Sequence, residues 1–192
     1  MVAVLLVLLA YLSGSVPYGA LLTRWLKGVD VRSAGSGNIG ATNVARVAGR
    51  GLGVLVLLLD AAKGAVPVAL SFLITGDSEV HAAVGLAAVL GHVFPVWLHF
   101  RGGKGVATAF GVIAVIQPWA AMAGFAAYAV LFALFRVSSI GSLAGGLAAA
   151  LVAVLSGGPR PYSILTLVLF ALMVFTHRGN IRRLLARAEK PL

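Results

Sequence analysis

Three polar segments interrupt an otherwise apolar chain, and their residue types are suited to binding anions. The first, Gly35 to Arg46, combines glycines, asparagines and hydroxyl residues with a cation. Three of its glycines formally match G-x-G-x-x-G, but no strand precedes them and no βαβ unit is possible, so a dinucleotide-binding fold is rejected. What remains is an anion nest of successive backbone N–H groups, helped by Ser36 and Thr42. A Gly/Asn-rich turn without a ligand is the alternative.

The second polar segment, Gly91 to Thr108, ends one apolar run, makes a glycine-flanked turn and begins the next helix. Lys104 stands near that helix N-terminus, where a cation opposes the helix dipole and an anionic ligand would offset the repulsion. Phosphate is the natural ligand. A Walker A loop is rejected because Gly105 follows the lysine. Arg101 has the alternative role of anchoring the loop at anionic lipid headgroups.

The third polar segment, His177 to Leu184, closes the last apolar run. On a helical continuation His177 and Asn180 lie on one face, so both are candidate ligands. The arginines that follow fit better as lipid-headgroup anchors.

One pair of opposite charges lies inside an apolar run. Asp60 and Lys63 are three residues apart, close enough to pair where either alone would be costly. Asp60 could act as a general base, but a structural ion pair that supports the polar site is the favoured interpretation. His92 is interpreted as a buried hydrogen-bonding histidine, and His81 receives no role.

The elements that must carry these segments are membrane-spanning helices. With 60% hydrophobic and 10% charged residues, the chain is too apolar for a soluble domain. Several uncharged runs approach or exceed the roughly 20 residues that a helix needs to cross a bilayer. The first run lacks a basic region before it, so it is predicted to be a retained span and not a cleaved signal peptide. The predicted fold is a single polytopic domain over 1–192, an all-α bundle with spans near 2–23, 52–75, 80–98, 105–117, 119–135, 138–156 and 161–177.

The distribution of basic residues indicates the membrane topology of the chain. Gln117-Pro118 is either a tight turn between two spans or a kink in one long helix. The turn gives seven spans and places thirteen basic residues, including Arg136 and Lys190, on one side and only Arg160 on the other. The kink gives six spans, with eight basic residues on one side of the membrane and six on the other. The positive-inside rule therefore favours seven spans, with the N-terminus outside and the C-terminus cytoplasmic. It also accounts for the formal charge of +10 without a nucleic-acid partner.

The sequence lacks the residues that several kinds of chemistry require. The absence of cysteine excludes disulfides, thiolate metal sites and a thioester intermediate on the protein. Five unclustered acids argue against a metal site, and no cofactor is predicted. Anion binding and positioning remain. A small anion transporter or channel would use similar residues, but its polar groups would lie near the bilayer midplane and not at one face.

The segments GSGNIGATN, FRGGKGVAT and HRGNIRRL, together with Asp60-x-x-Lys63-Gly64, resemble the bacterial membrane family of acyl-phosphate:glycerol-3-phosphate acyltransferases, PlsY. The resemblance covers nearly the whole chain. One departure is Arg101, where the family usually has lysine. The resemblance implies acyl transfer from acyl phosphate to the sn-1 hydroxyl of glycerol 3-phosphate at the cytoplasmic face of a bacterial inner membrane, the first step of phospholipid synthesis. It also implies an association with the enzyme that makes acyl phosphate.

The resemblance implies roles for individual residues as well. The Gly35 to Arg46 loop would hold acyl phosphate, and a substrate phosphate would take the hydroxyl proton, with Asp60 or His177 as the rival base. The expected catalytic residues are Ser36, Asn38, Arg46, Lys104 and His177. The expected substrate-binding residues are Gly35, Gly37, Gly40, Thr42, Asn43, Arg101, Gly102, Gly103, Ser142 and Asn180, with Asp60 and Lys63 in support. Among these, Ser142 rests on the resemblance alone.

Overall fold

The computed structural model describes residues 1–189 and 191–192, and Lys190 lies outside them. The regular elements in the described part are helices. The first half of the chain forms α1 (Val2–Ser15), α2 (Tyr18–Lys27), the 3-10 turn η1 (Val31–Ser33), α3 (Ala41–Ala48), α4 (Arg50–Ile74) and α5 (Ser78–Val93). The second half forms the 3-10 turn η2 (Val96–Leu98), α6 (Val106–Ile116), α7 (Pro118–Phe135), α8 (Ser138–Leu155), α9 (Arg160–Thr176) and α10 (Arg178–Leu185).

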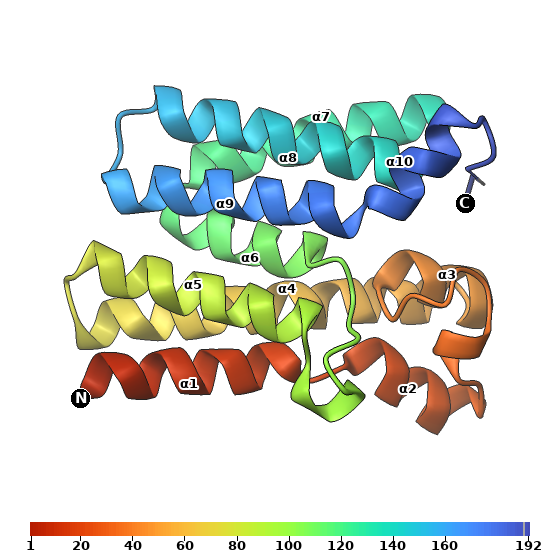
Figure 1. The fold of residues 1–192 in the computed structure, drawn as a ribbon, viewed down its shortest axis with the longest axis horizontal. Helices are drawn as coiled ribbons and strands as arrows, with labels where there is room; N and C mark the ends of the chain where they lie inside the picture. Colours follow the sequence, from red (N-terminus) through yellow and green to blue (C-terminus); the bar gives the residue numbers. More distant parts are fainter. Residues whose placement is uncertain (190) are drawn as a thin grey trace.

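The long helices form two groups joined by α6. In Figure 1, α1, α4 and α5 lie together in one half of the molecule, and α7, α8 and α9 lie together in the other. Helix α6 packs against α4 on one side and α7 on the other. Small residues allow close approach within each group: a Cβ added at Gly145 of α8 would lie 2.6 Å from the carbonyl oxygen of Gly124 in α7.

The two ends of the bundle differ in the segments that connect the long helices. Towards the right-hand end of Figure 1 lie α2, α3 and α10, together with the C-terminus, whereas the N-terminus lies at the opposite end. We call the first end the polar end; it contains residues 24–50, 94–105, 136–137, 177–189 and 191–192. It therefore brings together the three polar segments, which are spread along the sequence from Gly35 to Leu184.

Most of the predicted spans have matching helices. Among the described residues, five helical segments are long and apolar enough to cross a membrane; one of them joins α1 with α2 and another joins α5 with η2. The pair α9 and α10 would make a sixth, although it bends by 58°. The first predicted span is interrupted at Val16 and Pro17, between α1 and α2, because proline cannot continue the hydrogen-bond ladder. The predicted span 105–117 is instead the 11-residue helix α6, whose length of roughly 16 Å is well short of the bilayer core.

The chain makes a turn between α6 and α7. The two helices run in opposite directions in Figure 1, so Gln117-Pro118 does not kink one long helix. Gln117 is buried, donates to Ala153 O at 3.1 Å and accepts from Thr166 at 3.0 Å, which satisfies its amide away from water. The two helices meet at the Gln117 turn, but α7 has 18 residues and α6 only 11. The first residue of α6 therefore lies roughly 10 Å below the last residue of α7 along the bundle. Lys104, which precedes α6, is recessed accordingly.

Candidate active site

The recess at the polar end contains a direct contact between the second and third polar segments. Lys104 Nζ donates to Asn180 Oδ1 at 2.6 Å, although the two residues are 76 positions apart. The backbone of Lys104 is held as well, since Thr176 Oγ1 donates to its carbonyl oxygen at 3.1 Å. Asn180 is 6% exposed. The fold therefore brings together two candidate residues that the sequence places in different polar segments.

A carboxylate from the C-terminal tail completes this cluster. Glu189 accepts a hydrogen bond from Asn180 Nδ2 at 2.5 Å, from Ser139 at 3.2 Å and from Arg183 Nε at 2.6 Å. Burial alone raises the pKa of the Glu189 carboxyl, but the hydrogen bonds from Arg183 and Asn180 outweigh it and hold that pKa below its usual value. Asn180, Ser139 and Arg183 thus form a cluster of donors that binds a carboxylate.

The charge state of Lys104 is sensitive to this environment. Burial lowers the pKa of its ammonium to about 8, although the Glu189 carboxylate raises it, while Arg183 and Arg46 lower it further. A bound phosphate would add negative charge beside the ammonium and favour its protonated form. An anionic ligand would therefore raise the pKa of Lys104 in the same direction as Glu189 does.

His177 lies at the bend between α9 and α10 and is 2% exposed. A helix continues past this residue as α10, as expected, but the chain bends by 58° between α9 and α10. Its Nδ1 lies 2.8 Å from the carbonyl oxygen of Met173. Since a carbonyl oxygen only accepts, Nδ1 carries the proton and Nε2 of the neutral ring is an acceptor.

The buried side chain of Asn43 stabilises the backbone conformation of the first polar segment. Asn43 is 2% exposed, and its Nδ2 donates to the carbonyl oxygens of Val31, Ala34 and Asn38 at 2.9 to 3.0 Å. Its Oδ1 accepts from Ser36 N at 2.8 Å. Asn43 was expected to bind substrate, yet the loop backbone already uses its hydrogen-bonding groups. These hydrogen bonds show that Asn43 stabilises the conformation of the loop.

The loop also differs from the expected run of free amides. Ser36 N donates to Asn43, Gly37 N to Ala34 O at 3.0 Å, and Gly40 N to Asn38 Oδ1 at 2.8 Å. These backbone donors are paired within the loop, as backbone groups generally are. Anion binding here would therefore depend mainly on side chains such as the exposed Ser36 and Arg46.

Helix α8 joins the first polar segment to the other two. Thr42 Oγ1 lies 3.1 Å from Ser138 Oγ at the start of α8, and the next residue, Ser139, donates to Glu189. Ser142 is one turn further along; it is 5% exposed and donates to Ser138 O at 2.8 Å. Arg46 contacts the C-terminal tail, where one guanidinium N–H reaches Pro191 O at 3.5 Å. All three predicted segments are thus connected through α8 and the tail.

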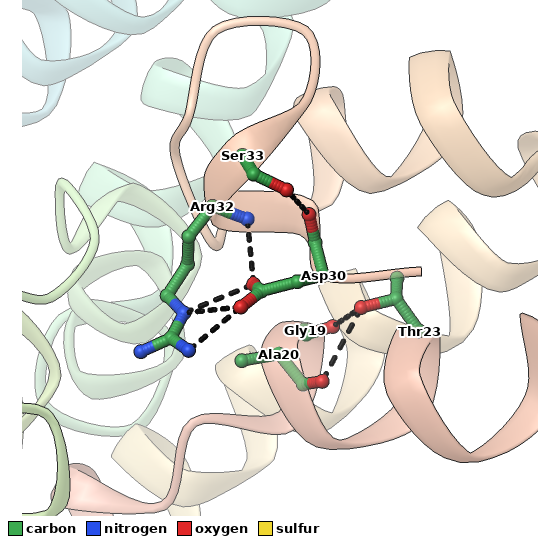
Figure 2. Close-up of polar contacts among 6 residues, drawn as sticks. All are labelled: Gly19, Ala20, Thr23, Asp30, Arg32 and Ser33. Atoms are coloured by element: carbon green, nitrogen blue, oxygen red, sulfur yellow. Dashed lines mark hydrogen bonds and ion pairs between the residues drawn. The ribbon is translucent and has the colours of Figure 1, made fainter. Parts of the chain in front are cut away.

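An open cavity of about 920 Å³ lies between the first and second segments. Figure 2 shows one wall, where Asp30 binds both the backbone and the guanidinium of Arg32. These hydrogen bonds lower the pKa of the Asp30 carboxyl to about 2. The other lining residues are Ser33, Gly37, Ile39, Leu98, His99, Arg101 and Gly102. Arg101 and Gly102 of the second segment therefore line the same cavity as Gly37 of the first.

Asp60 and Lys63 are paired, as predicted. Lys63 Nζ lies 2.8 Å from Asp60 Oδ1 and donates to Val16 O at 2.8 Å, at the break between α1 and α2. Both side chains are at most 4% exposed. This geometry favours the structural ion pair over a general base, since the carboxylate is occupied by Lys63.

Two polar residues of the site escaped the sequence interpretation. Ser139 is an ordinary small residue in sequence and gave no signal. Glu189 did give one, because it is the only acid after Glu79 and lies in a basic tail. Among the described residues, no group of three His, Asp or Glu side chains is arranged to hold a metal ion.

Comparison with known protein families gives a match over nearly the whole chain. The family model described as glycerol-3-phosphate acyltransferase matches residues 4–187. A glycerol-3-phosphate acyltransferase from Myxococcus xanthus is 60% identical over 186 residues, covering 96% of this chain and 97% of the relative. One from Anaeromyxobacter dehalogenans is 52% identical over 192 residues, covering 97% and 95%.

Two solved structures share the fold. Both are crystal structures of PlsY, an integral membrane glycerol 3-phosphate acyltransferase. The glycerol 3-phosphate form has a TM-score of 0.96 and 42% identity, and covers 100% of this chain and 96% of the other. The lysophosphatidic acid form has a TM-score of 0.94 and 41% identity, with the same coverage. The chain is accordingly an all-helical, multi-pass membrane protein.

Proposed function

Since the chain belongs to the glycerol-3-phosphate acyltransferase family, we propose that it transfers a fatty acyl group from acyl phosphate to the sn-1 hydroxyl of glycerol 3-phosphate. The products are lysophosphatidic acid and inorganic phosphate, and the reaction is the first step of bacterial phospholipid synthesis. The observation that carries the proposal is the contact of Lys104 with Asn180 beside buried His177. A relative of the same fold has been solved in a glycerol 3-phosphate form and in a lysophosphatidic acid form.

Glycerol 3-phosphate binds around Lys104, Ser142, His177 and Asn180. A phosphate dianion requires a cation and several hydrogen-bond donors, and this cluster contains both. The carboxylate of Glu189, held by Asn180 and Arg183, supports the assignment because it is an anion with similar acceptor geometry. The ammonium of Lys104 would contact the phosphate directly.

Acyl phosphate binds at the loop from Gly35 to Arg46. Ser36, Asn38 and Arg46 contribute polar groups near the reacting carbonyl, where they would stabilise the oxyanion. The 920 Å³ cavity beside Gly37 and Arg101 supports a headgroup position between the two loops. The remaining substrate contacts come from Gly35, Gly40, Thr42, Gly102 and Gly103, with Asn43 fixing the loop from beneath.

The chemical step is a single displacement. The sn-1 oxygen attacks the acyl carbon, an ester bond forms, and the bond between the acyl carbon and the phosphate oxygen breaks. The hydroxyl proton passes to a phosphate oxygen of the substrate pair, so no protein base is required. The rival base is His177, whose Nε2 can accept a proton; Asp60 is occupied by Lys63. Holding an activated donor against the acceptor can supply about 7 to 11 kcal/mol.

The whole chain acts as one polytopic domain of the bacterial inner membrane, with the polar end in the cytoplasm. Seven crossings, with the N-terminus outside, fit the basic residues gathered at that end and the two termini at opposite ends of the bundle (Figure 1). The acyl chain lies between helices at bilayer depth. An association with the enzyme that makes acyl phosphate would shorten the path of this reactive donor.

The test is lysophosphatidic acid formation by purified protein given labelled glycerol 3-phosphate and one of three donors: acyl phosphate, acyl-CoA or acylated carrier protein. Product with acyl phosphate alone is expected. Product with a thioester and none with acyl phosphate would refute the proposed donor, and no product with any donor would refute acyl transfer.

A further inference from the structure

A second buried histidine, His92, touches the glycine turn that carries Lys104. His92 is in the last turn of α5 and is 4% exposed. Gly103 N donates to its carbonyl oxygen at 3.1 Å, and Gly102 N donates to Val93 O at 3.0 Å. The turn thereby satisfies two carbonyl groups that the end of α5 leaves without helical partners.

The ring of His92 lies directly against this turn. A Cβ added at Gly103 would lie 2.0 Å from His92 Nε2, and one added at Gly102 would lie 2.1 Å from His92 O. These separations are shorter than any real carbon contact, so only glycine fits at either position. The position of the ring consequently limits where the backbone before Lys104 can lie.

The other edge of the ring faces the buried ion pair. His92 Nδ1 lies 3.6 Å from Asp60 Oδ1 and makes no hydrogen bond within the described residues. Asp60 is fixed by Lys63 and by the close packing of its helix against α6, where a Cβ at Gly64 would lie 2.2 Å from Thr108 O. Since Nδ1 of the buried ring has no other partner within the described residues, its N–H is attracted to the Asp60 carboxylate, which Lys63 holds in place.

We propose that His92 is a positioning residue for the acyl transfer: its ring, oriented by Asp60 and packed against Gly103, holds Lys104 Nζ opposite Asn180. The series Asp60, His92, Gly103 and Lys104 connects the ion pair inside the bundle to the proposed phosphate ligand. The inference rests on the proposed function, because it assigns Lys104 to glycerol 3-phosphate. It also gives the ion pair a task beyond packing.

Two substitutions of His92 test the inference. His92→Asn keeps an amide nitrogen near the place of Nδ1, and so the contact with Asp60, but removes the ring from Gly103. His92→Leu removes both. We expect both variants to raise the KM and the calorimetric Kd for glycerol 3-phosphate by about ten- to a hundredfold, because a shift of about 1 Å in a positioning group has such effects. The KM for acyl phosphate should stay within about twofold.

His81→Leu is the matched control. His81 is also a buried histidine of α5, but at the opposite end, where its ring contacts Tyr162 at 2.7 Å and Thr75 O at 2.8 Å. Its loss should lower the melting temperature and leave the KM for glycerol 3-phosphate unchanged, since a smaller folded fraction reduces Vmax alone. An unchanged KM in His92→Asn, or an equal rise in KM for both substrates, would overturn the inference.

A double variant separates action through Lys104 from a general effect. Adding His92→Asn to Lys104→Ala should not weaken glycerol 3-phosphate binding further, because the group that His92 positions is gone. Additive losses would overturn the inference. Failure of the proposed function is distinguishable, since the wild-type protein would then form no lysophosphatidic acid from acyl phosphate.

Discussion

Lys104 is a cation that the fold makes titrate close to neutral pH. Its pKa is lowered to about 8 by burial, so an appreciable fraction is neutral at mildly alkaline pH in the free enzyme. An ammonium can attract a phosphate dianion, whereas a neutral amine cannot. The affinity of the site for its acceptor substrate should therefore depend on pH.

We predict that kcat/KM for glycerol 3-phosphate falls as the pH rises through about 8, approaching a tenfold loss per unit above that value, because kcat/KM reports the free enzyme. Lys104→Arg should be weaker overall but flat over the same range, since a guanidinium stays charged. The measurement is a pH series from 7 to 9.5, corrected for spontaneous donor hydrolysis.

Unfolding would not explain such a loss. The pKa of Lys104 is lower in the folded than in the unfolded chain, so the unfolded chain binds more protons between about pH 8 and its usual value of 10.5. Through this group, stability rises with pH in that window. A wild-type kcat/KM that stays constant to pH 9.5 would contradict the prediction.

At the scale of elements, the loop from Val31 to Gly40 depends on a helix that follows it. Asn43 is in α3, yet its side chain fixes three carbonyl groups and one amide of the loop. We predict that Asn43→Ala lowers the free energy of unfolding by about 1–3 kcal/mol, because buried backbone groups lose their partners. It should also reduce the specific activity of the folded protein more than tenfold, since the donor loop loses its shape.

Gln117→Leu is the comparison for that variant. Gln117 is also a buried amide, but it lies at the opposite end of the bundle, bonded to Ala153 and Thr166. It should show a similar loss of stability by thermal denaturation with normal activity per folded molecule. Equal activity losses in both variants would mean that Asn43 has no special relation to the site.

The C-terminal tail is the element whose importance was least evident. Residues after α10 turn back, so that Glu189 reaches α8 and α10 and Leu192 N donates to Arg136 O at 2.9 Å. The tail therefore closes the polar end and holds Asn180 in the orientation that presents Oδ1 to Lys104.

At the scale of the whole molecule, the arrangement of α6 and α7 sets both the topology and the depth of the site. Because α6 and α7 form a hairpin, the loop before α6 and the loop after α7 lie at the same end (Figure 1). The shortness of α6 recesses Lys104. A water-soluble acceptor and a membrane-embedded acyl chain could meet at that depth.

The chain has no cysteine, so single-cysteine variants can test the orientation directly. We predict that Gly76→Cys and Ser156→Cys, at exposed positions opposite the polar end, react with an impermeant maleimide added to intact cells stripped of their outer membrane. Ala188→Cys and Arg50→Cys should react only after lysis. Labelling of the second pair in intact cells would reverse the proposed orientation.

The membrane environment of the chain, and the presence of its three polar segments at one end of the bundle, could be predicted from the sequence. Hydropathy and charge distribution depend only on residue types along the chain, so the membrane helices, the polar end and the turn at Gln117 could be predicted from them. The glycine-rich loops and His177 with Asn180 were likewise evident, because motifs of this kind are contiguous. The ion pair of Asp60 with Lys63 was predictable because helical spacing places them together.

The contacts that each polar group makes depend on the tertiary structure and could not be predicted from the sequence. The bonds of Glu189 to Asn180 and Ser139, the packing of His92 against Gly103 and the inward use of Asn43 all depend on how separate helices pack or how a loop folds back. Such contacts are long-range or depend on the path of an irregular loop, and no local periodicity encodes them. For the same reason the sequence did not indicate that the chain bends by 58° at His177, between α9 and α10.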